Sequence, residues 1–359
     1  MILSMQNIHR FLLNKGLVES QNLFQQDYIA RQLFPYKPIY HVRSGIVDYC
    51  LKQADFNSSW SIKLMPNYGL TLQIINEIES FNELKRVIPK FYNYDYADRI
   101  LTTTFYNDHI NLDEYQRMSG VINQDILNKV INITSKINVD VSSIQDSRIS
   151  LLPHEMPWIL EITKKDSQEK ELIARHNSIV QACFQNLTLT EVINTSRSFW
   201  QAKSLIHGDI KWGNFLIHQF SGDPSSILLT DWETADIGDP IWDLAGIIQN
   251  VISNQILNVG PRSIGRFPKY LVERECSSLK LLIIKIWRTY YQYKHSDITS
   301  KEHFHKAMVF TSARLIQTAS EANLYAPSIN PDAFNFLEVS KYLFTNKDDW
   351  SSSIDNPDG

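Results

Sequence analysis

The chain has 359 residues, of which 43% are hydrophobic and 21% are charged, and its formal net charge at pH 7 is −4. This length predicts one large or two modest domains with a buried core. The slight acidic excess argues against a nucleic-acid partner, because phosphate neutralisation needs a clustered surplus of Lys and Arg. The three cysteines form no C-x-x-C pair, so they indicate reduced thiols rather than a disulfide frame or a zinc site.

The amino terminus, MILSMQNIHRFLLNKG, lacks the basic stretch and long apolar core of a secretory signal. The most apolar later run, residues 279–287, is interrupted by Lys280 and Lys285 and is too short to span a bilayer. We therefore expect a cytoplasmic protein without a membrane partner.

Residues 1–107 predict a small sheet crossed by one main helix. Apolar positions at helical spacing predict leading helices within residues 5–34. Residues 39–53 are rich in β-branched and aromatic residues around Ser44-Gly45, which predicts a hairpin. A helix over residues 70–86 follows, and then two strand-like runs, VIPKFYNYD and DRILTTTFY.

Helical patterns dominate after residue 107. They predict helices near 111–118, 123–138, 167–184, 188–200, 242–257, 270–293, 301–322 and 332–343. Two short apolar runs, FLIH and SILLTDW, predict a hairpin embedded among these helices. The last fifteen residues are polar and are expected to fray. The predicted domains are an amino-terminal lobe (1–107), a helical carboxy-terminal lobe (108–345) and a polar tail (346–359).

Glycine is scarce, with 12 residues in the chain, about half of what an average usage of roughly 7% would give. No G-x-G occurs, which excludes the dinucleotide fingerprint. Gly208 and Gly213 have P-loop spacing, but Asn214 follows where that motif needs Lys. With Gly238 and Gly246 they cluster in one short stretch, which marks it as a place of unusual backbone.

That stretch contains polar side chains suited to phosphoryl transfer. LIHGDIKWGNFLI supplies Asp209, Lys211 and Asn214, and LLTDWETADIGDP supplies Asp231. The reaction requires a carboxylate to receive the proton of the attacking hydroxyl, oxygen ligands for Mg²⁺ and neutralisation of charge. Asp209 fits the base, Lys211 fits the neutralising cation, and Asn214 and Asp231 offer the hard oxygen ligands that Mg²⁺ prefers.

The segment H-G-D-I-K-W-G-N resembles the catalytic loop H-R-D-L-x-x-x-N of protein kinases, with the same Asp-to-Asn spacing. D-W-E and GDPIWDLAG make it more similar to the aminoglycoside phosphotransferase and choline kinase branch. The resemblance implies an α+β, two-lobed protein-kinase-like fold, with a small mixed-sheet amino-terminal lobe and a mainly helical carboxy-terminal lobe. It also implies ATP and Mg²⁺ as cofactors.

The resemblance further implies a strand lysine that contacts the nucleotide phosphates and a helix glutamate that holds it. Lys52 and Glu77 are the favoured pair, with Lys63 and Glu79 as the competing choice. Ser44 and Gly45 form the only turn available to cover the phosphates, so a generous backbone cradle is not expected.

The base of the nucleotide should lie against Thr104, Phe105 and Tyr106, in the strand that leads into the hinge between the lobes. We expect His207 to pack behind the catalytic loop. Asp239 and Asp243 are expected to form structural hydrogen bonds. Glu233 is left open between a structural position and a place near the metal.

A narrower likeness rests on FWQAKSLIHGDIKWGN, LTDWETADIGDPIWDLA, CLKQ and MPWIL. These runs are similar to the stand-alone phosphotransferases of thioamitide and class V lanthipeptide biosynthesis. The likeness implies phosphorylation of Ser or Thr in a peptide precursor ahead of dehydration, with a lyase as partner. The alternatives are a small-molecule kinase for an amino sugar, choline, ethanolamine or another amino alcohol, and a catalytically silent scaffold. The presence of Asp209, Asn214 and Asp231 together disfavours the scaffold.

Overall fold

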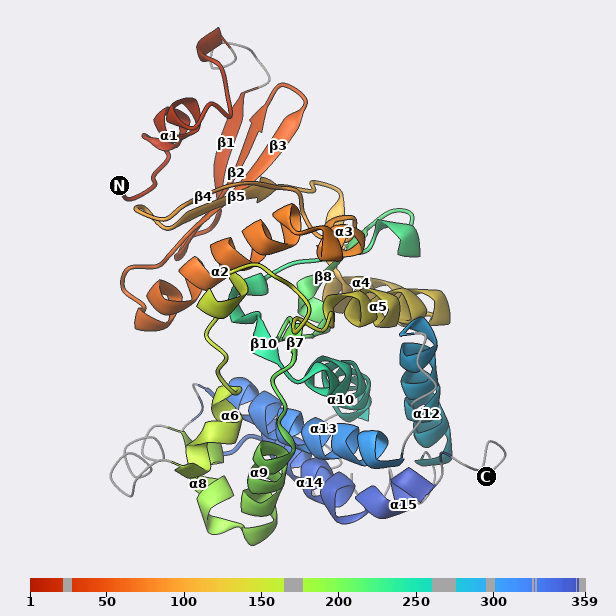
Figure 1. Ribbon diagram of the computed structural model, residues 1–359. Coiled ribbons are helices and arrows are strands. Elements are labelled where there is room, and N and C mark those ends of the chain that lie inside the picture. Colours follow the sequence, from red (N-terminus) through yellow and green to blue (C-terminus); the bar gives the residue numbers. More distant parts are fainter. Residues whose placement is uncertain are drawn as a thin grey trace. The chain divides into compact units, whose positions relative to one another are not determined.

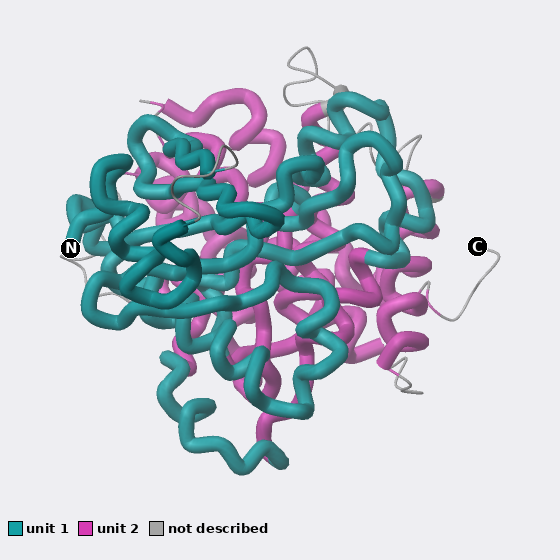
Figure 2. The backbone as a smooth tube through the Cα atoms, turned by 90° about the horizontal axis from the view of Figure 1, so that it is seen from above, with its two compact units in different colours: residues 1–129, 143–153, 212–236 teal, residues 130–142, 154–211, 237–359 magenta. Residues whose placement is uncertain are grey.

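The computed structural model describes residues 1–21, 28–164, 177–259, 276–294, 301–324, 326, 328–352 and 354. The chain divides into two compact units whose segments alternate along the sequence (Figure 2). Unit 1 is Met1–Lys129, Ser143–Pro153 and Trp212–Asp236, and unit 2 is Val130–Ser142, His154–Lys211 and Ile237–Gly359. The lobe boundary at residue 107 stays a prediction.

Unit 1 contains a five-stranded sheet in the order β1-β2-β3-β5-β4, in which each neighbouring pair is antiparallel. Its strands are β1 (Ile29–Phe34), β2 (Lys37–Ser44), β3 (Val47–Gln53), β4 (Phe91–Asp95) and β5 (Ile100–Thr104). The predicted hairpin over 39–53 is confirmed as β2 and β3. The helical prediction for 5–34 is correct for α1 (Ile8–Asn14) but wrong for β1, which hydrogen-bonds to β2 across a turn at Pro35.

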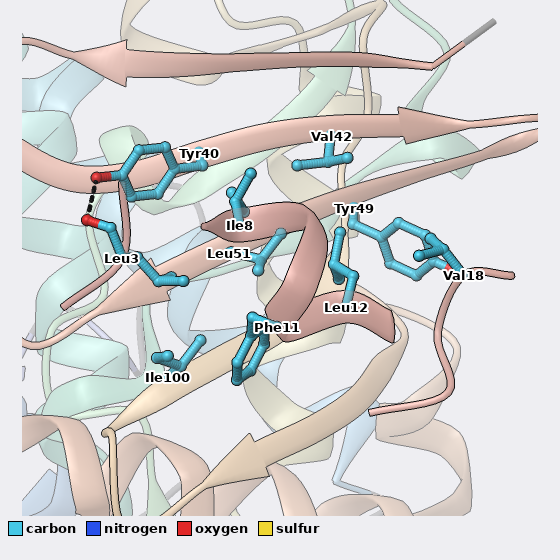
Figure 3. Close-up of a cluster of buried hydrophobic side chains, with 10 residues drawn as sticks. All are labelled: Leu3, Ile8, Phe11, Leu12, Val18, Tyr40, Val42, Tyr49, Leu51 and Ile100. Carbon is cyan, nitrogen blue, oxygen red and sulfur yellow. Dashed lines mark hydrogen bonds between the residues drawn. The ribbon is translucent and has the colours of Figure 1, made fainter. Parts of the chain in front are cut away.

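Side chains that alternate along β2 and β3 form the core under α1 (Figure 3). Tyr49 and Leu51 of β3 are buried in this cluster, and the Tyr40 hydroxyl donates to the carbonyl of Leu3 at 2.9 Å. Because successive strand residues point to opposite faces, Cys50 and Lys52 project from the other side of the sheet. The core packing therefore fixes the face on which the strand lysine lies.

Helix α2 (Ser59–Glu77) contacts β4 and β5 (Figure 1). It begins at the N-cap Ser58, whose side chain accepts from the backbone of Ser61, and continues through Pro66. The prediction of a helix over 70–86 is wrong at both ends. The predicted start is too late because an internal proline, here Pro66, normally marks a helix boundary. The predicted end is too late because after α2 the chain forms η2 (Glu79–Phe81) and the short α3 (Asn82–Lys85).

A three-stranded antiparallel sheet completes unit 1. Its order is β6 (His109–Asn111), β8 (Phe215–His218) and β9 (Leu228–Leu229), which confirms the predicted hairpin. The short helices η5 (Trp212–Asn214) and η7 (Trp232–Thr234) adjoin β8 and β9 in sequence, and η3 (Ile149–Leu151), η6 (Pro224–Ser226) and α4 (Leu112–Ser119) lie in the same unit. Helix α5 (Gln124–Ile137) runs from unit 1 into unit 2.

Unit 2 is mainly helical, apart from β7 (Ser204–Ile206), which pairs with β10 (Asp236–Gly238) in a two-stranded sheet. Its helices are α6 (Trp158–Glu161), η4 (Ile162–Lys164), α8 (Ser178–Gln185), α9 (Leu187–Phe199), α10 (Pro240–Val259), α12 (Cys276–Tyr293), α13 (Lys301–Ala322), α14 (Pro331–Thr345) and α15 (Lys347–Ser352). Helix α13 is buried over most of its length and packs against α9, α10 and α14.

The helices predicted after residue 107 are confirmed wherever the chain is described. Residues 167–176 of the helix predicted at 167–184, and residues 270–275 of the one at 270–293, lie outside the described residues. The prediction of a frayed tail is wrong for α15, because Trp350 is only 3% exposed and anchors the segment. None of the described helices is long and apolar enough to cross a membrane.

Candidate active site

Lys52 lies in a pocket of about 640 Å³ whose walls all belong to unit 1. Its Nζ is 2.5 Å from Oδ1 of Asp231 and 2.7 Å from Oε2 of Glu233. Burial lowers the pKa of Lys52, but the two carboxylates raise it by more, so its pKa lies above the ordinary value. The pocket thus holds a fixed positive charge between two carboxylates.

The predicted ion pair between Lys52 and Glu77 is wrong. Glu77 is bonded to Arg148 and is about half exposed. Tyr68 of α2 instead faces Lys52, with Nζ 5.2 Å from the ring centroid. Glu77 lies nine residues after Tyr68, which is about two and a half helical turns, so it points to the opposite face of α2.

The competing pair, Lys63 and Glu79, does not fit either. Lys63 is exposed on α2 itself rather than on a strand, and Glu79 is exposed in η2 rather than on a helix face. Glu233, two residues after Asp231, supplies the second carboxylate to Lys52. Glu233 therefore lies in the same pocket as Lys52, and a place near a metal stays a prediction.

Ser44 and Gly45 do not line the pocket. Register pairs Ser44 with Val47 at one end of the β2–β3 hairpin and Ile39 with Lys52 at the other. Val47 and Lys52 are five residue steps apart along the strand, about 17 Å at the usual rise. The pocket is lined instead by Phe34 and Lys37, which flank the β1–β2 turn. The prediction missed this turn because it took β1 for a helix, although Pro35-Tyr36 between two extended runs was the available signal.

Thr104, Phe105 and Tyr106 line the same pocket, as the sequence predicted for residues near the nucleotide base. Cys50 lies beside them, because it pairs with Thr103 across β3 and β5. Burial raises the pKa of the Cys50 thiol to about 11, so this part of the pocket carries no thiolate near neutral pH. The contact of these residues with a base stays a prediction.

Asn214 and Asp231 are brought together by the β8–β9 pairing. Both the backbone N–H and the hydroxyl of Thr230 donate to the carbonyl of Asn214, at 2.9 and 3.1 Å. Asp231 follows in a left-handed conformation (φ 66°, ψ 54°). An amide oxygen and a carboxylate are hard ligands of the kind that Mg²⁺ takes together with phosphate oxygens, and the Lys52 ammonium beside Asp231 shows that a cation is accommodated there. Asp231, which lines the pocket beside Lys52, therefore fits the predicted metal role, and the role of the Asn214 side chain stays a prediction.

Within the described ranges, no group of three or more His, Cys, Asp or Glu side chains is arranged to hold a metal ion.

Asp209 and Lys211 lie in unit 2 and form an ion pair, with Nζ 2.6 Å from Oδ2. Burial raises the pKa of Asp209, but Lys211 and the buried Arg314 lower it by more, so its pKa lies below the ordinary value. Asp209 is therefore ionised near neutral pH, as a proton acceptor must be.

The backbone around Asp209 is held by Asp243 of α10. The Asp243 carboxylate accepts from the N–H of His207 at 2.8 Å and from that of Gly208 at 3.0 Å. Gly208 has φ +81°, a conformation that glycine adopts without steric cost. His207 is fully buried, and its Nδ1 accepts from the N–H of Asp209 at 3.3 Å. The predictions that His207 and Asp243 are structural are confirmed.

Asp239 is structural in the same sense. It is fully buried, accepts from the N–H groups of Gln201 and Ile241, and forms an ion pair with Lys306.

Arg314 of α13 was not predicted from the sequence. Its guanidinium donates to the carbonyl of Ile210 at 2.9 Å and to that of Gly208 at 3.3 Å, on either side of Asp209. It also lies over the ring of Trp242, whose Nε1 donates to Gly208 at 3.0 Å. An arginine inside the apolar run AMVFTSARLI was the available signal, since charged residues are seldom fully buried without partners.

A comparison with protein families matches the part of the chain that contains Asp209, Asn214 and Asp231. A model of the family described as "Phosphotransferase enzyme family" matches residues 147–259, less than half of the chain. No protein of curated function matches in sequence.

Solved structures share the fold at low identity. A choline/ethanolamine kinase family protein from Mesorhizobium loti is 11% identical, covers 97% of this chain and 99% of its own, and superposes with a TM-score of 0.54. The protein named APH(2")-IIia, in complex with GDP and kanamycin, is 13% identical, with 93% and 99% covered and a TM-score of 0.51. A choline kinase from Streptococcus pneumoniae is 16% identical, with 94% and 99% covered and a TM-score of 0.49.

The expected kinase-like α+β fold is therefore confirmed. The likeness to phosphotransferases of peptide biosynthesis finds no support among these matches. Residues 147–259 thus match a phosphotransferase family model, and the chain shares the fold of the two structures with TM-scores of 0.54 and 0.51.

Proposed function

We propose that this chain transfers the γ-phosphoryl group of a nucleoside triphosphate, ATP in the first instance, to a hydroxyl group, with Mg²⁺ as cofactor. The observation that carries the proposal is the ion pair of Lys52 with Asp231 in a pocket that Thr104, Phe105 and Tyr106 also line. This pocket therefore contains the Lys52 cation to bind phosphates, the Asp231 carboxylate to bind a metal and a wall of Thr104, Phe105 and Tyr106 to contact a base. The named complex of a similar fold with GDP supports nucleotide use.

In the proposed reaction Lys52 holds the nucleotide phosphates, and Asn214 and Asp231 hold Mg²⁺, which when bound neutralises charge on the phosphates. The acceptor oxygen forms a bond to the γ-phosphorus while the bond from that phosphorus to the β,γ-bridging oxygen breaks. Asp209 receives the hydroxyl proton and later releases it to water. Lys211 neutralises charge on the phosphoryl group in transfer. The products are the phosphate ester and the nucleoside diphosphate.

The acceptor is the finer part of the proposal. The similar structures are named for choline, ethanolamine or kanamycin, which supports a small hydroxyl-bearing amine. Ser or Thr of a peptide precursor rests on the sequence resemblance alone. That acceptor, a partner lyase and a cytoplasmic location stay predictions.

Two substitutions test the reaction. Asp209→Asn should abolish phosphoryl transfer while nucleotide affinity, measured by calorimetry with Mg²⁺, stays within about twofold, because Asp209 acts on the acceptor. Asp231→Asn should weaken Mg-nucleotide binding by at least about tenfold, since it removes a charged metal ligand. Asp223→Asn, a change of the same kind in an exposed turn of unit 1, is the control. Full turnover by Asp209→Asn would contradict the proposal.

The acceptor is tested by following nucleoside diphosphate release with choline, ethanolamine, kanamycin and Ser- or Thr-containing peptides, each with the wild type and with Asp209→Asn. A small-molecule kinase should turn over only choline, ethanolamine or kanamycin, and this turnover should be lost in Asp209→Asn. Turnover of the peptides alone would establish the peptide acceptor.

A further inference from the structure

Two adjacent residues of α2, Asn67 and Tyr68, contact the segment Asp231–Ala235. The Asn67 side-chain amide donates to the carbonyl of Ala235 at 2.6 Å and to that of Glu233 at 3.2 Å. The backbone N–H of Asp231 donates to the Tyr68 hydroxyl at 3.0 Å. Three hydrogen bonds thus run from one turn of α2 to the loop that carries the proposed metal ligand, and all of these residues lie in unit 1.

The loop needs such support because Asp231 is not glycine. Its left-handed backbone (φ 66°, ψ 54°) is disfavoured for residues with a Cβ and persists where surrounding contacts determine it. The bond from its N–H to Tyr68 fixes this residue directly. The bonds to Glu233 and Ala235 fix the following 3₁₀ turn.

Tyr68 also touches the phosphate lysine. Its side chain is 6% exposed, and the ring centroid lies 5.2 Å from Nζ of Lys52, within the range of a cation–π contact. Asp231 and Glu233 supply the carboxylates for this lysine. Helix α2 therefore contacts Lys52 directly through the Tyr68 ring and indirectly through the Asp231–Ala235 segment, and not through Glu77.

We propose that Asn67 and Tyr68 are a positioning pair that holds Asp231 in its metal-binding conformation and links α2 to Lys52. The inference rests on the proposed function, because it assumes that Asp231 binds Mg²⁺. The pair touches neither the acceptor nor the transferring phosphoryl group. Its loss should therefore change the response to Mg²⁺ more than it changes the affinity for the nucleotide alone.

The test compares Tyr68→Phe with Tyr94→Phe. Tyr94 is the matched control because it packs its ring directly against Gly69 of α2, and its buried hydroxyl has no hydrogen-bond partner among the described residues. Nucleotide binding is measured by calorimetry in EDTA and across a Mg²⁺ titration, with circular dichroism to confirm folding. Asn67→Leu serves as a second variant, so that the proposal stays testable if Tyr68→Phe fails to fold.

For Tyr68→Phe and Asn67→Leu we expect the Mg²⁺ concentration at half-maximal effect to rise about tenfold, the scale of one lost buried hydrogen bond. Affinity in EDTA should stay within about twofold, and Tyr94→Phe should match the wild type in both. Unchanged Mg²⁺ dependence in the variants, or an equal change in Tyr94→Phe, overturns the positioning pair while the proposed function stands. A wild type whose nucleotide binding ignores Mg²⁺ overturns the metal role itself, and with it the inference.

Discussion

Nζ of Lys52 lies 2.5 Å from Oδ1 of Asp231, so the lysine proposed to hold the phosphates and the proposed metal ligand neutralise each other. When the nucleotide binds, its phosphates compete for the lysine while a divalent cation competes for the aspartate. Binding of the phosphates to Lys52 frees Asp231 for the cation, and binding of the cation to Asp231 frees Lys52 for the phosphates. Each event therefore favours the other. We therefore expect nucleotide and Mg²⁺ to bind cooperatively.

Lys52→Met should weaken nucleotide binding by about tenfold to a hundredfold, the range for a lost charge-assisted contact of roughly 1.5–3 kcal/mol. It also leaves Asp231 and Glu233 without the cation between them, and their repulsion further opposes the phosphates. Calorimetry with Mg²⁺ and nucleotide measures the effect. Lys63→Met removes an exposed lysine from α2 in the same unit and should leave affinity unchanged. An equal loss in both variants would contradict the assignment of Lys52.

Glu233→Gln should lower nucleotide affinity severalfold, because it removes one of the two carboxylates that orient Lys52. Glu77→Gln should have no measurable effect, since Glu77 forms a partly exposed pair with Arg148 and such pairs contribute under about 1 kcal/mol. Binding isotherms of the two variants, collected side by side, check this. The reverse order would restore Glu77 as the partner of the lysine.

The sequence predicted correctly several features that depend on local pattern, although it missed β1 and misplaced both ends of α2. The segment from His207 to Asn214 is recognised as one motif because its polar residues lie close together in the sequence, and the described helices after residue 107 follow from regular apolar spacing. Lys52 was proposed because it lies near the end of a predicted strand, with Lys63 as the competing choice, and its contact with nucleotide phosphates stays a prediction. The structural role of Asp243 was predicted from the resemblance of GDPIWDLAG to the aminoglycoside phosphotransferase and choline kinase branch, and its bonds to His207 and Gly208 agree with it.

The errors in the site contacts share a physical cause, which is that tertiary packing decides which residues become partners. The errors at β1 and α2 come instead from local signals that were misread. Glu77 and Tyr68 lie on the same helix, and only the rotation of α2 on the sheet decides which of them meets Lys52. The Ser44-Gly45 turn was predicted to cover the phosphates. It lies at the end of the β2–β3 hairpin away from Lys52, so the β1–β2 turn flanks the pocket instead. Arg314 is separated from Asp209 by more than a hundred residues, so its contact leaves no local pattern.

Gly246→Ala should slow phosphoryl transfer with little change in nucleotide affinity. A Cβ at this position of α10 would lie 2.8 Å from the carbonyl oxygen of Ile210 and 3.0 Å from its Cβ, so the residue after Asp209 would have to move. A displacement of about 1 Å at a catalytic group can cost on the order of a hundredfold in rate. The ratio of kcat values, measured at saturating nucleotide, checks this.

Ala245→Gly is the control for a general loss of stability. It changes the neighbouring buried residue of α10 and should destabilise the helix by about 1 kcal/mol without pushing on Ile210. If Ala245→Gly slows the reaction as much as Gly246→Ala, the effect of the latter comes from lost stability, and the steric explanation is wrong.

Arg314→Met should shift the acid limb of the pH profile of kcat/KM to higher pH. Burial alone raises the pKa of Asp209, and Lys211 and Arg314 together hold it below the ordinary value. Removing one of these cations raises the pKa of Asp209, so the base becomes protonated, and activity falls, at a higher pH than in the wild type.

Arg314→Lys keeps the charge and should keep the acid limb close to its original position. Arg197→Met, a change at a partly buried arginine elsewhere in unit 2, should leave the profile unaltered. A lower kcat/KM with an unmoved acid limb would mean that Arg314 supports only the backbone of Gly208 and Ile210 and does not act on the ionisation of Asp209.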